Sequence, residues 1–93
     1  MRTINRTRQF KKDYKREARG RHRKTLDKDL VAVLELLIAE ALLPASYRDH
    51  PLSGDWKDHR DLHIKPDLIL IYRLPNDAEL DLVRLGSHGE LGL

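Results

Sequence analysis

Histidines and aspartates gather in the C-terminal half of this chain, in a region otherwise rich in turn-forming and strand-forming residues. Four of the five histidines lie between residues 50 and 88, among them His50, His63 and His88, and Asp61 and Asp67 flank the middle one. Imidazole has an unperturbed pKa of about 6.5, so it both accepts and donates protons near neutral pH, and a neighbouring carboxylate orients it. The set therefore predicts general acid–base chemistry without a metal ion.

RNA cleavage is one reaction that such a set suits. Without metal, one group must take the proton of a 2′-hydroxyl and another must protonate the leaving 5′-oxygen, and each contributes about 10²–10⁴-fold. Cations near the scissile phosphate stabilise the developing charge. Spacing alone leaves scattered surface histidines as the alternative. The basic residues close to the histidines in sequence are Lys57, Arg60, Lys65 and Arg84.

A zinc site is a second alternative for the histidines. His59 and His63 have the spacing of a helical ligand pair, but the alternation of residues 61–64 favours a strand. The chain has no cysteine, and no third ligand lies at a characteristic spacing. We therefore expect neither a metal ion nor another cofactor. His59 is interpreted as a bystander and His22 as part of a solvated basic face.

The charge of the chain is segregated along its length. Residues 1–28 contain twelve Lys/Arg and three Asp/Glu, whereas residues 29–93 contain six and twelve, so the net charge of +3 hides a strongly basic N-terminal segment. Such a face is typical of proteins that bind nucleic acid, although it also suits an acidic protein partner or a solvated helix. The candidate RNA contacts in this segment are Arg8, Lys11, Lys12, Lys15, Arg16 and Arg19.

The first helix is predicted from a cap and an apolar spacing. Thr7 is the expected N-cap, because a threonine hydroxyl can accept a hydrogen bond from a free backbone N–H of the first turn. Phe10, Tyr14 and Ala18 follow at four-residue intervals and define one face of the helix. The helix is expected to end near Gly20.

The rest of the chain predicts one more helix and a meander of strands. Residues 2–6 are expected to form a short edge strand, and residues 26–41 a helix with a broad apolar stripe that Pro44 ends. Residues 47–57 have little periodicity and are expected to form an ordered loop. Strands are predicted at residues 61–64, 68–73 and 79–85, with turns at 65–67 and 74–77.

These elements predict a single α+β domain spanning residues 1–93. Two N-terminal helices should pack on a mostly antiparallel sheet of three to four strands. The longest apolar stretch, residues 30–43, is interrupted by Glu35 and Glu40 and is too short to cross a bilayer. The first twelve residues contain no apolar segment typical of a secretory signal, so a cytoplasmic location without membrane contact is expected.

Two extended motifs resemble one known family. Residues 47–57 read Y-R-D-H-P-L-S-G-D-W-K, and residues 60–72 read R-D-L-H-I-K-P-D-L-I-L-I-Y. Together with the later Gly86-Ser87-His88, they closely resemble the YafQ-type branch of the RelE toxin superfamily. The basic first helix and the leucine-rich second helix agree with that family in order and length, so the resemblance covers essentially the whole chain.

The resemblance implies a RelE-like fold and a bacterial type II toxin. Such a toxin is an endoribonuclease, or mRNA interferase, that cuts mRNA in the ribosomal A site through attack of the 2′-oxygen and without metal. Its partners would be the ribosome with its rRNA, the mRNA, and a cognate antitoxin that covers the site in a heteromeric complex. By position, His50, His63, Asp67 and His88 match catalytic residues and Asp61 a supporting carboxylate. His88 would be the general acid and His50 or His63 the base, while the basic helix docks on rRNA.

Two positions depart from the family pattern. Leu68 stands where members often have an aromatic residue, and the residues after His88 include no aromatic side chain that could stack on a base. One alternative is therefore a catalytically impaired module that mainly binds its antitoxin. Another is a gyrase-inhibiting toxin on the same scaffold, although that branch lacks this histidine set. Trp56 is interpreted as a packing residue.

Overall fold

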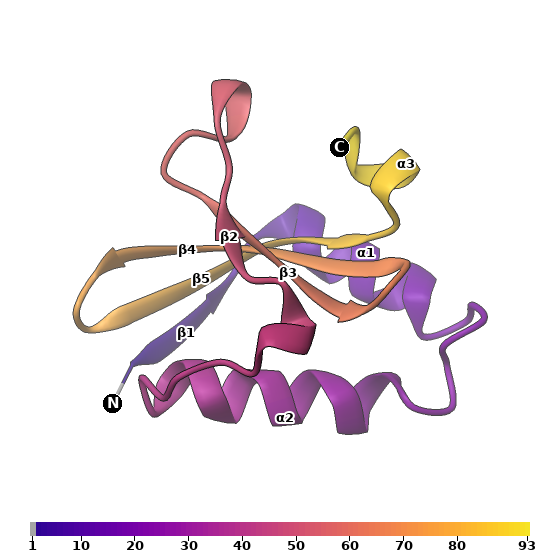
Figure 1. Ribbon diagram of the computed structural model, residues 1–93. Coiled ribbons are helices and arrows are strands. Elements are labelled where there is room, and N and C mark those ends of the chain that lie inside the picture. The colour runs from indigo at the N-terminus through magenta and orange to yellow at the C-terminus, as the bar shows by residue number, and fades with distance from the viewer. Residues whose placement is uncertain (1) are drawn as a thin grey trace.

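The computed structural model describes residues 2–93, and in this range the strands form one sheet with the order β1-β5-β4-β3-β2 (Figure 1). Its strands are β1 (Thr3–Arg6), β2 (His50–Pro51), β3 (Arg60–Lys65), β4 (Leu68–Asn76) and β5 (Glu79–Gly86). Its helices are α1 (Arg8–Glu17), α2 (Leu26–Ile38) and the short α3 (His88–Leu91), with 3₁₀ turns η1 (Ala45–Tyr47) and η2 (Gly54–Trp56).

The sheet is mostly antiparallel, as predicted, but larger than expected. The β2–β3, β3–β4 and β4–β5 pairs are antiparallel, and only β1 runs parallel to its neighbour β5. The predicted sheet of three to four strands grows to five because residues 50–51, expected within a loop, pair with β3 as a short edge strand. The α+β class and the position of the two long helices before the meander are confirmed.

One face of the sheet carries the main core. The buried positions of α2 fall at Leu26, Leu30, Val33 and Leu37, which is the spacing of one helical face. Burying a leucine side chain stabilises the fold by about 1.5–3 kcal/mol, so this stripe fixes α2 on the sheet. Figure 1 shows α2 below the strands. Phe10 of α1 and seven strand residues complete this core: Leu62, Leu68, Leu70, Tyr72, Leu80, Leu82 and Leu85.

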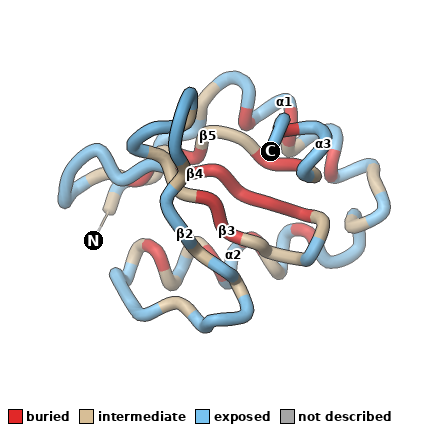
Figure 2. Tube along the Cα trace, turned by 45° about the horizontal axis from the view of Figure 1, so that its top comes forward, coloured by how far each residue is buried: buried red, intermediate tan, exposed pale blue. Residues whose placement is uncertain are grey.

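The second face of the sheet, opposite these helices, carries a smaller cluster. Ile69, Ile71 and Leu91 are buried there, and Leu52, Trp56 and Val83 pack against them. The predicted packing role of Trp56 is therefore confirmed. Figure 1 shows α3 and the loop between β2 and β3 on this side, while Figure 2 shows the central strands buried and this loop largely exposed.

Three element boundaries differ from the prediction. Thr7 caps α1 as expected, accepting from the N–H of Phe10 at 3.0 Å, but the helix ends at Glu17 and Ala18 is exposed. α2 ends at Ile38, well before Pro44, since Glu40 turns the chain with a φ of 56°. β4 continues through most of the turn predicted at residues 74–77, so only residues 77 and 78 form the turn.

α3 was not predicted, although the sequence carries its signal. Ser87 and Glu90 form a capping box, in which each side chain accepts a hydrogen bond from the other residue's backbone N–H. The S-x-x-E pattern is typical of a helix start, and here it begins a helix of four residues.

Among residues 2–93, no helix has the length and apolar character needed to cross a membrane.

Candidate functional site

Three histidines form a row on the second face of the sheet. The ring centroids of His50 and His63 lie 6.5 Å apart, and those of His63 and His88 lie 5.2 Å apart. We call His50, His63 and His88 the histidine row. The three residues come from three different elements, β2, β3 and α3, which the fold brings together.

Strand register explains why the row forms. Leu62 faces the helices, so its neighbours Asp61 and His63 face the other side. His63 and Gly86 both lie opposite Ile69, because β3 and β5 flank β4. His88 follows two residues after Gly86 and therefore starts α3 beside His63. At the other end, β2 places His50 opposite Asp61.

A backbone carbonyl and a buried carboxylate both lie beside Nδ1 of His50. Asp61 is 3% exposed, and its Oδ1 lies 2.9 Å from Nδ1 of His50. The N–H at this nitrogen is directed at the carbonyl oxygen of Arg48, 2.8 Å away, and not at Asp61. Asp61 Oδ1 has no well-directed hydrogen bond of its own. Because both neighbours of Nδ1 are acceptors, that nitrogen carries a hydrogen. The free nitrogen of His50 is therefore Nε2, on an imidazole side chain that is half exposed.

The other two histidines differ in their surroundings. Nδ1 of His63 is buried and has no hydrogen-bond partner among residues 2–93. His88 is exposed at the first position of α3. The helix itself is anchored by Leu91, which is 4% exposed against Ile69 and Ile71.

Asp67, at the turn between β3 and β4, contacts side chains outside the row. Its carboxylate accepts from Nε2 of His22 at 2.9 Å and pairs with Arg21 at 2.9 Å. Desolvation opposes its charge, but the hydrogen bond and charge of His22, with Arg21, outweigh that effect and hold the pKa of Asp67 below its ordinary value. The interpretation of His22 as a solvated residue is wrong, since its side chain is 14% exposed and hydrogen-bonded.

Three of the four cations predicted near the scissile phosphate already pair with carboxylates. Lys65 contacts Asp29 at 2.9 Å, and Arg84 contacts the buried Asp13 at 2.7 Å. Lys57 is exposed at the end of η2. A role of these lysines and of Arg84 in binding RNA stays a prediction.

Arg60, the third of the paired cations, stabilises the segment before His50. It pairs with Asp49 at 2.9 Å, and the hydroxyl of the buried Tyr72 donates to the same carboxylate. Burial, followed by the contact with Asp49, raises the pKa of Tyr72 well above its ordinary value. Because Arg60 lies on the Leu62 face of β3, this network faces away from the histidine row and anchors the residue next to His50. RNA binding by Arg60 likewise stays a prediction.

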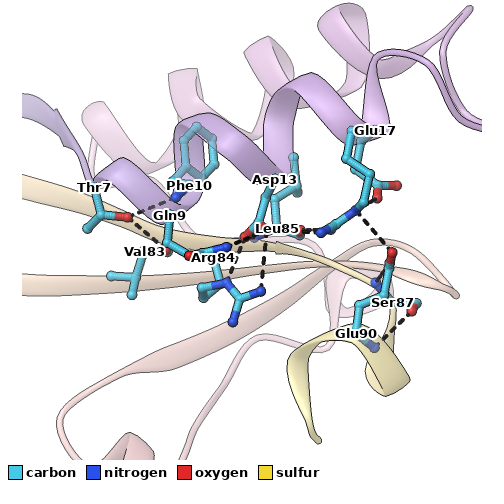
Figure 3. A network of polar contacts seen from close by, with 11 residues as sticks. Thr7, Gln9, Phe10, Asp13, Glu17, Val83, Arg84, Leu85, Ser87 and Glu90 are labelled. Atoms are coloured by element: carbon cyan, nitrogen blue, oxygen red, sulfur yellow. Dashed lines mark hydrogen bonds and ion pairs between the residues drawn. The ribbon is translucent and has the colours of Figure 1, made fainter.

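The predicted basic face is exposed, but one of its residues is paired with carboxylates. Arg16 contacts three carboxylates, at 3.0 Å from Asp13, 2.9 Å from Glu17 and 3.0 Å from Glu90. These three acidic residues are labelled in Figure 3. The other predicted cations, all exposed, are Arg8, Lys11, Lys12 and Lys15 of α1 and Arg19 in the turn after it. Sequence reasoning missed the network beneath them, because Asp13 and Glu17 were not expected on the buried face of α1.

A hollow of about 300 Å³ adjoins the row beside His63. Tyr47, Arg48, Lys65 and Pro66 line it together with His63. It combines an aromatic ring with cationic side chains, which is the chemistry that holds a nucleotide beside a reacting phosphate. In the part of the chain that the structure describes, no group of three His, Asp or Glu has the arrangement of a metal site.

The chain is similar to known toxins over nearly its whole length. The model of a family described as bacterial toxin of type II toxin-antitoxin system, YafQ, matches residues 2–92. The mRNA interferase toxin YafQ of Escherichia coli K12 is 49% identical over 84 residues, which cover 89% of this chain and 87% of that protein. The crystal structure of the E. coli DinJ-YafQ complex matches with a TM-score of 0.80 and 39% identity over 98% of both chains. A metal-bound toxin from Helicobacter pylori matches with a TM-score of 0.81 and 41% identity, covering 98% of this chain and 99% of that one.

Proposed function

This chain belongs to the YafQ family of bacterial type II toxins, and from that premise we propose that it is an endoribonuclease that cleaves mRNA on the ribosome. The observation that carries the proposal is the histidine row, with the buried Asp61 within 2.9 Å of one end of it. Acting on ribosomes places the protein in the cytoplasm. A cognate antitoxin is the proposed partner, since the E. coli relative has been solved in complex with DinJ.

We assign the proton transfers to the two ends of the row. The 2′-oxygen attacks phosphorus, the bond from phosphorus to the 5′-oxygen breaks, and the products carry a 2′,3′-cyclic phosphate and a 5′-hydroxyl. Nε2 of His50 takes the proton of the 2′-hydroxyl, and His88 gives a proton to the leaving 5′-oxygen. The free Nε2 of His50 supports its role as the base, and the exposure of His88 supports contact with the leaving group.

Asp61 and His63 assist in this scheme. The carbonyl of Arg48 orients His50 through Nδ1, and the carboxylate of Asp61, 2.9 Å from the same nitrogen, stabilises the imidazolium that forms when Nε2 accepts a proton. His63, between the two ends, is placed to contact a non-bridging phosphate oxygen through Nε2. Asp67 keeps its proposed catalytic role because it matches the family motif. Its contact with His22 places that histidine beside the turn between β3 and β4.

The exposed cations of α1 are the proposed surface for docking on rRNA. Contacts between lysine or arginine and phosphate release counterions, so this binding should weaken steeply as salt concentration rises. The hollow beside His63 is the proposed place for a nucleotide next to the scissile bond, with Arg48 and Lys65 in its lining to attract phosphate.

Dependence on the ribosome is tested by comparing free and ribosome-bound mRNA. Purified protein should cut mRNA positioned in the A site and leave the same RNA intact in free solution, with 2′,3′-cyclic phosphate on the upstream fragment. Equal cleavage of both would contradict ribosome dependence. If neither RNA is cut while the antitoxin still binds, the impaired binding module becomes the better description of this chain.

Independence from transition metals is a separate prediction, and the metal-bound H. pylori relative makes it worth testing directly. Protein stripped by a chelator, then returned to buffer containing only the Mg²⁺ that ribosomes need, should cleave at the untreated rate. The reason is that two imidazoles supply both proton transfers. The prediction fails if stripping abolishes cleavage and Cu²⁺, Zn²⁺ or Ni²⁺ restores it.

A further inference from the structure

We infer that Arg16 is a positioning residue that sets the place of His88, rather than a contact to RNA. The inference rests on the proposed function, since it concerns the general acid of that reaction. α3 has only four residues, too few to form a stable helix by themselves. The position of His88 therefore depends on what anchors this turn to the rest of the fold.

Arg16 makes the polar link between α3 and the body of the protein. Its Nε lies 3.0 Å from Oε2 of Glu90, and its Nη2 donates to the carbonyl oxygen of Leu85 at 2.7 Å. These two partners lie on either side of the turn that leads from β5 into α3. One guanidinium thus joins the last residues of the strand to the helix that carries His88.

Glu90 connects this link to the start of the helix. Its other oxygen, Oε1, accepts the backbone N–H of Ser87 at 2.9 Å, directly before His88. The hydroxyl of Ser87 in turn accepts the N–H of Glu90 at 3.2 Å. A displacement of the Glu90 carboxylate would therefore loosen the cap that fixes the backbone at His88.

Arg16 is itself held from below by a fully buried carboxylate. Its Nη1 donates to Oδ1 of Asp13 at 3.0 Å, and Asp13 is 0% exposed. The second oxygen of Asp13 accepts from Nε of Arg84 at 2.7 Å and from the N–H of Leu85 at 3.0 Å. The guanidinium of Arg16 is therefore fixed by a buried anion of α1 and, through it, by β5.

Gly86 supplies the space for this arrangement. A Cβ atom at this position would lie 2.6 Å from Nη2 of Arg16 and 3.2 Å from Oε1 of Glu90. Both distances are too short for normal contacts, so any larger residue would push the two side chains apart. The close approach of Arg16 to the turn thus depends on glycine at the end of β5.

The two roles open to Arg16 make opposite predictions for Glu90. A contact to RNA would be helped by removing a nearby negative charge, so Glu90→Gln would leave binding unchanged or tighten it. A positioning role predicts that Glu90→Gln slows cleavage, because glutamine keeps the cap but loses the charge that attracts Arg16. The Arg16→Gln variant should slow cleavage in the same way, because it removes the guanidinium that contacts Glu90.

The experiment measures single-turnover cleavage of ribosome-bound mRNA over a range of protein concentrations. Arg16→Gln and Glu90→Gln should each lower the maximal rate about ten- to a hundred-fold, the cost of misplacing a reacting group by about 1 Å, with the half-saturating concentration unchanged. The double variant should be no slower than the slower single variant. Arg73→Gln removes another arginine–carboxylate contact, to Asp81 at 3.1 Å, and serves as the matched control with wild-type rates.

A measurement of geometry separates this inference from the proposed function. The ring protons of His63 and His88 should give a nuclear Overhauser contact in wild type that weakens in Arg16→Gln, whether or not the protein cleaves RNA. Weaker binding at an unchanged maximal rate would overturn the inference, and so would wild-type rates with an unchanged contact. If Arg16→Gln fails to fold, Glu90→Gln decides, because it leaves the pairs of Asp13 intact.

Discussion

Cleavage of ribosome-bound mRNA should fall by about 10²–10⁴-fold when His88 is replaced with alanine, because the leaving 5′-oxygen then lacks its proton donor. The ring of His88 is exposed and makes no hydrogen bond among residues 2–93, so its removal should leave the fold intact. Single-turnover cleavage on programmed ribosomes measures the loss. Growth after induction of the variant should be close to that of an uninduced culture.

The chain offers a matched control for this prediction in His59. Its ring packs edge-on against Trp56 at a centroid distance of 5.3 Å and bonds to the carbonyl of Lys57, outside the histidine row. His59→Ala should therefore cleave at nearly the wild-type rate. Equal cleavage by wild type and His88→Ala would remove His88 from the mechanism. An equal loss in both variants would mean that the assay reports a general disturbance of the protein.

Most of the fold could be predicted because its main signals are local. The stripe of α2 at Leu26, Leu30, Val33 and Leu37, and the alternation around Leu62, follow directly from helical and strand periods. The short β2 could not be predicted, because two residues of a Pro-containing loop become a strand only when β3 lies beside them. The capping signal at Ser87 was present in the sequence, but the helix that follows has only four residues and was therefore not predicted.

The buried face of α1 shows what periodicity misses. Apolar spacing selected Phe10, Tyr14 and Ala18, whereas the structure buries Phe10, Asp13 and Glu17. A carboxylate is buried only where partners satisfy its charge, and the partners of Asp13 include Arg84 and the N–H of Leu85, far along the chain. That pairing depends on the parallel docking of β1 and α1 along β5, which no local pattern contains.

The candidate site was predicted in part for the same reasons. Positions at the ends of strands converge in a meander, and so His50, His63 and His88 were correctly grouped in space. Asp67 was grouped with them because it is close in sequence, but its turn directs the carboxylate to His22. His22 lies among arginines and lysines in the sequence, where nothing distinguishes it from a solvated residue.

The largest effect on stability is expected at Asp13. Replacing Asp13 with alanine leaves the guanidinium of Arg84 and the N–H of Leu85 without their acceptor in a buried environment, which typically costs about 3–5 kcal/mol. Chemical denaturation at neutral pH measures the change in the free energy of unfolding. Asp81→Ala is the control, since it removes a partly exposed pair with Arg73 and should cost about 1 kcal/mol or less.

The pH dependence of this stabilisation has a definite sign. Burial opposes the charge of Asp13, but the hydrogen bonds from Arg84 and Leu85 outweigh it and lower its pKa below the ordinary 3.8. A carboxyl group with a lowered pKa in the folded state stabilises the fold above its unfolded pKa and loses that contribution as pH falls through the folded value. The difference in unfolding free energy between wild type and Asp13→Asn should therefore be constant from pH 7 to about 5 and shrink below about pH 4. A difference that stays constant into acid would mean that packing, not charge, makes Asp13 important.

Asp13 and Arg16 should then separate stability from catalysis. Both belong to the network that reaches Ser87 and Glu90, on either side of His88. Asp13 also neutralises Arg84 inside the fold, whereas the side chain of Arg16 is 39% exposed. Asp13→Asn should lower both the free energy of unfolding and the cleavage rate, whereas Arg16→Gln should mainly lower the rate. If Arg16→Gln destabilised the protein as much as Asp13→Asn, its slow cleavage would follow from a loosened fold, and the specific link from α1 to the proton donor would not be needed to explain it.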